Sequence, residues 1–321
     1  MSSLTALVII NPQAGKAGAE HAADLLIAEL EKKGLKTEKV LTCGISDARD
    51  IAIARASMFD LVVACGGDGT LSEVISGLMR LDERPPVGFL PVGSACDVAT
   101  TFKLPSDPIK AAAIMTEGLS FAIDIGKVSG SPAALRNDLP SGVVPPTTEQ
   151  LPDYFTYVAS FGAFTETSYA TNRALKKRLG HFAYVLSGAK ALGQIRKIKT
   201  TVAVDGNDLS GTYIFGGVLN SFSVGGMVKL DDVIFDDGLF EVMLVQPPRN
   251  VGQFSGLLSR LLRRKTGGVI VRERGQTITF SFEEPVSFTV DGEYGGTRTT
   301  WTIENIPRAI YLKVKSLPFT D

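Results

Sequence analysis

The sequence predicts an α/β fold of two domains: an N-terminal α/β domain with a mostly parallel sheet, then a C-terminal β-sandwich-like domain. The chain has 321 residues, more than one typical core holds. Strand and helix patterns alternate in the first third, whereas strand patterns dominate after residue 153. Between these parts, residues 129–153 contain five prolines among serines, glycines and threonines, which is typical of a surface loop. We therefore expect domains over residues 1–128 and 154–306.

Short apolar or alternating runs predict the strands of the first domain, over residues 6–10, 36–41, 61–65 and 87–90. Helices are expected over residues 17–33, over 47–57 with Ser46 as N-cap, after residue 70, and from Asp107-Pro108 onwards. This alternation predicts a parallel sheet with helices on both faces.

Runs rich in β-branched and aromatic residues predict strands in the second domain. They cover residues 154–160, 198–204, 212–219, 239–245, 277–282, 286–290 and 299–303. Asp205-Gly206-Asn207-Asp208 predicts a tight hairpin turn. Two helices are expected to interrupt the strands, near residues 178–194 and 250–264.

Charge and cysteine content exclude several classes of protein. The formal net charge of -1 gives no reason to expect a nucleic-acid partner. The three cysteines are far apart and lack metal-site spacing, which favours a reducing, cytoplasmic location. The N-terminus lacks the pattern of a signal peptide, and no run reaches the ~18 apolar residues of a membrane span. Any contact with a membrane is expected to be peripheral.

A glycine-rich loop follows the third expected strand and precedes an amphipathic helix. It consists of Gly66, Gly67, Asp68, Gly69 and Thr70. Glycines let a ligand approach the backbone, and the amides at a helix start attract anions. A carboxylate among such amides suggests that a cation such as Mg²⁺ accompanies the anion. The alternative is a plain strand-to-helix turn.

Two further loops follow strands of the same expected sheet. Asn11, Pro12 and Gly15 come after the first strand, and Gly93 and Ser94 come after the fourth. The carboxyl ends of parallel strands share one edge, where open α/β sheets bind ligands. The three loops together predict a nucleotide site, although each alone is also compatible with a surface turn.

In order and spacing, seven motifs resemble the diacylglycerol kinase catalytic family, which includes bacterial lipid kinases and sphingosine kinases. They are Asn-Pro-x-x-Gly at 11–15, Gly-Gly-Asp-Gly-Thr at 66–70, Pro-Val-Gly-Ser-x-x-Asp at 91–97, Asp-Ile-Gly at 124–126, Ser-Phe-Gly-Ala at 160–163, Asp-Asp-Gly-Leu-Phe at 236–240 and Asp-Gly-Glu at 291–293. The agreement extends from about residue 6 to 315. NAD kinases share the glycine loop, so the ordered set carries the resemblance.

The resemblance implies an ATP-dependent kinase that uses Mg²⁺, with its active site in the cleft between the two domains. It implies that Asp291 accepts the proton of the acceptor hydroxyl and that Glu293 binds Mg²⁺ or positions the base. The alternative for Asp291-Gly292 is a type I′ hairpin turn. It also implies that a last strand near residues 309–314, within 307–321, returns to the first domain.

A supporting acidic network is implied for Asp68, Asp97 and Asp124, which would hold Mg²⁺ through carboxylates and water. Thr42, directly after the second expected strand, is added to the nucleotide-binding set.

A structural metal site is implied near residues 234–239. The ligands would be Asp237 and the backbone carbonyls of Ile234 and Leu239. A plain turn is the alternative.

Two features depart from the family pattern. Ser94 stands where the family usually has threonine, and Cys96 where it usually has asparagine. Serine can still donate to a phosphate, but cysteine replaces an amide poorly. The proline-rich loop at 129–153 is the second departure, because the family normally runs directly into the next strand.

The expected helix near 250–264 has an apolar stripe and a basic end. The stripe consists of Phe254, Leu257, Leu258, Leu261 and Leu262, and the basic end of Arg260, Arg263, Arg264 and Lys265. Such a helix can lie on anionic lipid. The alternative is that the stripe packs on the core and the basic residues favour the helix C-terminus.

We therefore expect an ATP-dependent lipid kinase that phosphorylates the hydroxyl of a lipid such as diacylglycerol at a membrane surface. One alternative is an NAD kinase-like phosphotransferase. The other is a catalytically silent nucleotide-binding regulator on the same fold, which the Cys96 substitution keeps open. A homodimer is compatible with the sequence, which does not define the oligomeric state.

Overall fold

The computed structural model describes residues 3–15, 18–93, 96–134, 147–162, 196–224, 228–230, 232–262 and 267–318. The chain forms two units. Unit 1 comprises Met1–Ile125, Phe235–Asp237 and Ile306–Asp321, and unit 2 comprises Gly126–Ile234 and Gly238–Asn305. The fold is α/β, with parallel strands in the N-terminal part and antiparallel strands in the C-terminal part, as the sequence predicts.

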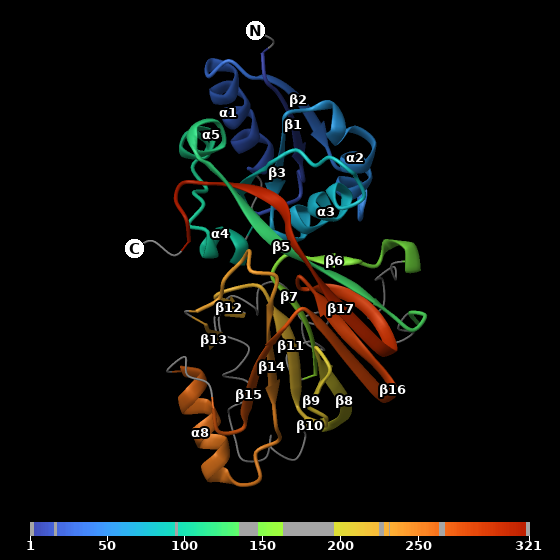
Figure 1. The fold of residues 1–321 in the computed structure, drawn as a ribbon. Coiled ribbons are helices and arrows are strands. Elements are labelled where there is room, and N and C mark those ends of the chain that lie inside the picture. Colours follow the sequence, from blue (N-terminus) through green and yellow to red (C-terminus); the bar gives the residue numbers. More distant parts are fainter. Residues whose placement is uncertain are drawn as a thin grey trace. The chain divides into compact units, whose positions relative to one another are not determined.

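Unit 1 contains a parallel sheet in the strand order β4-β3-β1-β2, of which β1, β2 and β3 are labelled in Figure 1. These strands are β1 (Thr5–Ile10), β2 (Lys36–Leu41), β3 (Leu61–Gly66) and β4 (Val87–Pro91). The apolar runs of the inner strands β1, β3 and β4 are buried. In the edge strand β2, exposed residues are interspersed with half-buried ones. Leu312, near the end of the long strand β17 (Glu293–Val314), pairs in parallel with Val87 of β4. The last strand therefore returns to the first unit.

Helices connect these strands. They are α1 (Ala19–Lys32), α2 (Asp47–Arg55), the 3₁₀ turn η1 (Ala56–Met58), α3 (Asp68–Leu78), α4 (Asp97–Thr101) and α5 (Pro108–Glu117). Asp107 caps α5 as predicted, because its carboxylate accepts from the Lys110 amide at 2.8 Å. Ser46 is the N-cap residue of α2 as predicted, but its φ is 65° and its side chain makes no capping hydrogen bond. The carboxylate of Glu73 on α3 accepts from the Ser46 and Ala48 amides instead.

The elements of unit 2, besides β17, are η2 (Thr148–Gln150), β6 (Tyr154–Phe155), β7 (Val158–Gly162), β8 (Ile198–Val204), β9 (Asn207–Asp208), β10 (Gly211–Tyr213), β11 (Phe215–Leu219), β12 (Ser223–Val224), β13 (Val228–Lys229), β14 (Phe240–Val245), α8 (Val251–Leu262), β15 (Ile270–Gly275) and β16 (Thr277–Val290). The strands form an antiparallel sheet in the order β15-β14-β11-β7-β16-β17, with β8 paired to β16. Strand β5 (Leu119–Gly130) runs from unit 1 into unit 2. Of the two helices expected here, the one near 250–264 is α8, and the one near 178–194 lies outside the described residues.

Aromatic side chains fill the core of unit 2. Phe288 stacks on Trp301 with ring centroids 4.1 Å apart, and Phe161 packs against both Phe280 and Phe288. These residues come from β7, β16 and β17, so the cluster joins strands that are distant in the sequence. Offset and edge-on contacts of this kind add to the hydrophobic gain of burying large rings.

The ends of the expected proline-rich loop are partly built into unit 2. Strand β5 continues to Gly130, and the Ser131 hydroxyl accepts from the Thr299 and Thr300 amides at 3.1 Å. Residues 135–146 lie outside the described part of the chain.

A buried carboxylate links strands β14 and β15 at the edge of the unit 2 sheet. The Glu241 side chain on β14 is only 2% exposed, and the Arg272 Nε donates to it at 2.7 Å. The Arg274 Nε lies 2.9 Å from its other oxygen. Because a buried carboxylate is costly without such partners, this pairing joins β15 firmly to β14.

Candidate active site

Three loops meet at the carboxyl edge of the parallel sheet in unit 1. They follow β1, β3 and β4, which are neighbours in the sheet. The Asn11 Nδ2 donates to the Thr70 Oγ1 at 3.2 Å, and the Val92 and Gly93 amides both donate to the carbonyl of Gly66. The structure therefore brings the three predicted loops together.

Two glycines let these loops approach one another. A Cβ on Gly93 would lie 2.7 Å from the Cα of Gly67. A Cβ on Gly15, whose φ is +72°, would lie 2.2 Å from the carbonyl oxygen of Val92. Contacts this short with backbone atoms cannot form without moving a loop, so both positions require glycine.

The start of helix α3 offers backbone amides to an anion. Its N-cap is Gly67, which has no side chain to satisfy the first amides of this 11-residue helix. Gly69 and Thr70 belong to the first turn. The helix dipole places partial positive charge at this end, which favours phosphate.

The other predicted nucleotide-binding residues lie around this edge. The Asn11 Oδ1 accepts from the Gln13 amide at 3.0 Å, which closes a turn around Pro12. Thr42 follows β2, and its amide donates to the carbonyl of Ile10 at 2.8 Å, so it lies beside the carboxyl end of β1. Ser94 lies outside the described residues.

Asp68 joins the glycine loop to helix α4. Its carboxylate accepts from the Asp97 amide at 2.7 Å and from the Val98 amide at 3.3 Å. Burial raises the pKa of the Asp97 carboxyl above its usual value. The Asp68 carboxylate therefore binds the first amides of α4, and Asp97 follows it there at the start of this helix.

Asp124 has a different setting. It is fully buried on β5, and its carboxylate accepts from the Arg308 amide at 2.8 Å. Its own amide donates to the carbonyl of Phe235 at 2.7 Å. Asp124 therefore ties together segments of unit 1 that are far apart in the sequence.

Cys96, the unusual residue of the third loop, is partly buried beside Gly93. Burial, followed by the charge of Asp68, raises the pKa of its thiol to about 11. The folded state thus holds this proton more tightly than the unfolded state does. The raised pKa of Cys96 therefore contributes to the stability of the folded state. This contribution is complete below the ordinary thiol pKa of 9.0 and is lost as pH rises through about 11.

We expect iodoacetamide at about pH 8 to modify Cys43 and to spare Cys96, because the thiolate is the reactive form. Cys43 is exposed, whereas burial also raises the pKa of Cys65. Peptide mass spectrometry would measure the label, with denatured protein as the control in which all three cysteines react. Labelling of Cys96 as fast as that of Cys43 in folded protein would contradict this assignment.

In unit 2, the Asp-Gly-Glu motif forms the turn between β16 and β17. Val290 pairs with Glu293, and Asp291 and Gly292 have φ values of 48° and 83°. The two-residue hairpin turn that the sequence left as an alternative is therefore present.

The Asp291 side chain is held inside the unit by backbone amides. Its Oδ2 accepts from the Thr156 amide at 2.7 Å, and its Oδ1 accepts from the Tyr157 and Val158 amides at 3.0 and 3.1 Å. Only 3% of Asp291 is exposed, whereas Glu293 is an exposed residue. Thr156 and Tyr157 form the break between β6 and β7, where the sequence predicts one continuous strand, and Val158 begins β7. Backbone donors leave no mark in the residue types, so the sequence did not reveal them.

The residues of the implied structural metal site are divided between the units. Asp237 belongs to unit 1, whereas Ile234 and Leu239 belong to unit 2. Among the described residues, no group of three or more His, Cys, Asp or Glu side chains is arranged to hold a metal ion. The metal assignment stays a prediction.

Comparison with known proteins decides the family. A model of the diacylglycerol kinase catalytic domain matches residues 5–128. A Bacillus subtilis (strain 168) protein named diacylglycerol kinase is 31% identical over 296 residues, which cover 91% of this chain and 90% of that protein. A Staphylococcus carnosus (strain TM300) protein of the same name is 31% identical and covers 91% and 89%. The chain belongs to the diacylglycerol kinase family.

Solved structures support the fold of this diacylglycerol kinase family member. Two structures of Bacillus anthracis str. Sterne proteins described as diacylglycerol kinases cover 98% of both chains. Their TM-scores are 0.77 and 0.71, at 20% and 18% identity. At these identities the likeness concerns the fold. Among the described residues of this family member, no helix is long and apolar enough to cross a bilayer.

Proposed function

We propose that this protein transfers the γ-phosphoryl group of ATP to the hydroxyl of a lipid such as diacylglycerol. The observation that carries the proposal is the meeting of three glycine-containing loops at the start of α3, with Asp68 and Asp97 beside them. The names of the relatives support diacylglycerol as the acceptor.

On the phosphate side, the residues of unit 1 bind and orient the triphosphate. The uncapped amides at the start of α3 hold phosphate oxygens, and Gly93 and Gly15 keep the neighbouring loops close enough to surround them. Asp68 and Asp97 would hold Mg²⁺ through water, and this ion would neutralise charge on the phosphates. Asp68 also fixes the start of α4, so the acids and the third loop are positioned together.

On the acceptor side, we assign the two acids of the hairpin turn roles opposite to those that the resemblance implies. Asp291 already accepts from three amides, and these donors occupy most of the lone-pair sites of its carboxylate. It is therefore a poor proton acceptor and a good positioning residue. Glu293 is exposed at the end of the same turn, so it can reach a hydroxyl that arrives from solvent or from a lipid surface. We assign proton acceptance to Glu293.

A phosphotransfer assay with labelled ATP and a panel of acceptors tests the proposed function. The panel contains diacylglycerol, a long-chain base, phosphatidylglycerol and NAD, each with and without Mg²⁺. We expect label in a lipid product only when Mg²⁺ is present. Transfer to NAD alone would establish the NAD kinase alternative, and ATP binding without transfer to any acceptor would establish the silent regulator.

A further inference from the structure

One end of the proline-rich segment at 129–153 is joined to strand β17 a few residues beyond the Asp-Gly-Glu turn. Ala134 and Thr297 exchange two backbone hydrogen bonds, of 2.8 and 3.1 Å. The Ser131 amide donates to the carbonyl of Thr300 at 3.1 Å. This end of the segment therefore pairs with the strand that carries the turn.

The other end of the segment packs at the same place. Leu151 is only 3% exposed, and a Cβ on Gly296 would lie 2.8 Å from the Leu151 Cδ1. The same Cβ would lie 3.4 Å from the Cβ of Ala133, at the first end. Both described ends of the segment therefore lie against one short stretch of β17.

This stretch of β17 contains a β-bulge. Ser287 of β16 pairs with Thr297, and Thr289 pairs with Tyr294, so one residue of β16 lies opposite two residues of β17. The two residues, 295–296, are both glycines, and the second has a φ of +95°. A bulge interrupts the ladder and redirects nearby side chains, and glycine adds backbone freedom. The bulge thus gives the turn beyond it a point on which to pivot.

A chain of hydroxyl groups crosses the bulge. The Tyr294 hydroxyl donates to the carbonyl of Ala134 at 3.3 Å and lies 2.8 Å from the Thr297 Oγ1. Because a hydroxyl has one proton, Tyr294 accepts from Thr297, which in turn accepts from the Ser287 hydroxyl at 2.7 Å. The chain joins β16, β17 and the proline-rich segment, and Tyr294 follows Glu293 directly in the sequence.

We propose that Tyr294 is a positioning residue, which braces the turn against the proline-rich segment and so fixes the direction of the Glu293 carboxylate. This inference rests on the proposed role of Glu293 as proton acceptor. Proton transfer requires an aligned acceptor, so a brace across the flexible bulge raises kcat without contacting either substrate.

Steady-state transfer of label from ATP to diacylglycerol by the full-length protein tests this role. Tyr294→Phe removes only the hydroxyl, and we expect kcat to fall about tenfold. The KM for ATP should stay within about twofold, because the nucleotide loops belong to unit 1. Thr297→Val should give the same result. The double variant should be no slower than either single variant, since all three break one chain of hydrogen bonds.

Tyr311→Phe is the matched control for the kinetics. It removes the same hydroxyl from a side chain that is 49% exposed on the same strand. Its kcat should equal that of wild type.

Hydrogen exchange, measured by mass spectrometry, tests the brace without any need for activity. Tyr294→Phe and Thr297→Val should each speed exchange in the peptide covering residues 288–297 about fivefold, because the turn opens more often when the chain of hydrogen bonds is broken.

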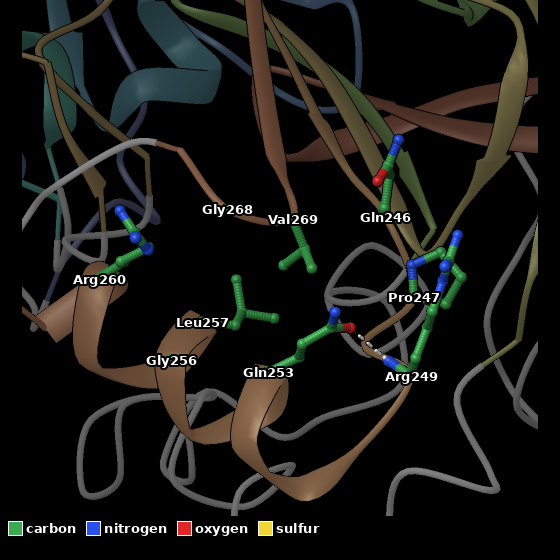
Figure 2. Close-up of a pocket in the computed structure, with 9 residues that line it drawn as sticks. All are labelled: Gln246, Pro247, Arg249, Gln253, Gly256, Leu257, Arg260, Gly268 and Val269. Carbon is green, nitrogen blue, oxygen red and sulfur yellow. Dashed lines mark hydrogen bonds between the residues drawn. The ribbon is translucent and has the colours of Figure 1, made fainter.

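A distant part of unit 2 supplies the control for exchange. Helix α8 and the segments after β14 and before β15 line a cavity of ≈ 340 Å³, where the Gln253 side chain accepts from the Arg249 amide at 2.8 Å (Figure 2). The length of β11, roughly 14 Å, separates this cavity from the Asp291 turn. Gln253→Ala also removes one hydrogen bond, but it should leave exchange at residues 288–297 unchanged.

Unchanged kcat in both Tyr294→Phe and Thr297→Val would overturn the proposal, even with faster exchange of the turn. An equal fall of kcat in Tyr311→Phe, or faster exchange of the turn in Gln253→Ala, would also overturn it. A wild type that transfers no label to lipid would contradict the proposed function instead. Exchange of the turn would then decide by itself whether Tyr294 braces it.

Discussion

Replacing Glu293 with glutamine should lower kcat for phosphoryl transfer by about 100- to 10,000-fold, the range in which a general base contributes. The substitution keeps the size of the side chain and removes its ability to accept a proton. Because Glu293 is exposed at a hairpin turn, the free energy of unfolding should stay within about 0.5 kcal/mol of wild type. Steady-state kinetics and urea unfolding measure the two quantities.

Substitutions at Asp291 should affect stability, unlike those at Glu293, and this difference identifies the proton acceptor. Asp291→Ala leaves three buried amides without their acceptor, so it should lower the free energy of unfolding by about 3–5 kcal/mol. The matched control is Glu284→Gln, since the Glu284 side chain is 83% exposed on the same unit. If Glu293→Gln keeps wild-type kcat while Asp291→Asn is stable and inactive, the proton acceptor is Asp291.

The second large effect should come from Gly93→Ala. The new methyl would lie 2.7 Å from the Cα of Gly67, so the third loop must move away from the glycine loop. We expect the Kd for ATP to rise about tenfold or more, equivalent to roughly 1.4 kcal/mol of binding free energy. Titration calorimetry with Mg²⁺-ATP measures the change.

Gly44→Ala is the control for this effect, because a Cβ at Gly44 would meet nothing within 4 Å. Its ATP affinity should equal that of wild type. Unchanged affinity in Gly93→Ala would show that the close approach of these loops is not needed to hold the nucleotide.

Local patterns predicted most of the first unit and its nucleotide loops. The buried runs of β1, β3 and β4 and the glycine loop between β3 and α3 depend on periodicity and turn chemistry, which act over a few residues. The Asp205-Gly206 turn between β8 and β9 is correct for the same reason, since a two-residue hairpin with positive φ at both positions selects these residues.

What the sequence missed depends on contacts between distant residues. Glu73 replaces Ser46 as the cap of α2 from a neighbouring helix. Strand β16 is continuous through a register shift between Ser281 and Val286, where Glu283-Glu284-Pro285 looked like a break between two strands. Two of the amides that hold Asp291 belong to a break between β6 and β7, which no residue pattern marks. Tertiary packing decides each of these cases.

Single-turnover transfer from labelled ATP to diacylglycerol, with wild type and Glu293→Gln at saturating Mg²⁺-ATP, tests the proposed lipid kinase most directly. We expect label to enter the lipid rapidly with wild type, and Glu293→Gln to bind ATP normally but to transfer the label at least about 100-fold more slowly. Equal transfer rates for the two proteins would contradict the proposal, as would release of the label as inorganic phosphate with none in lipid.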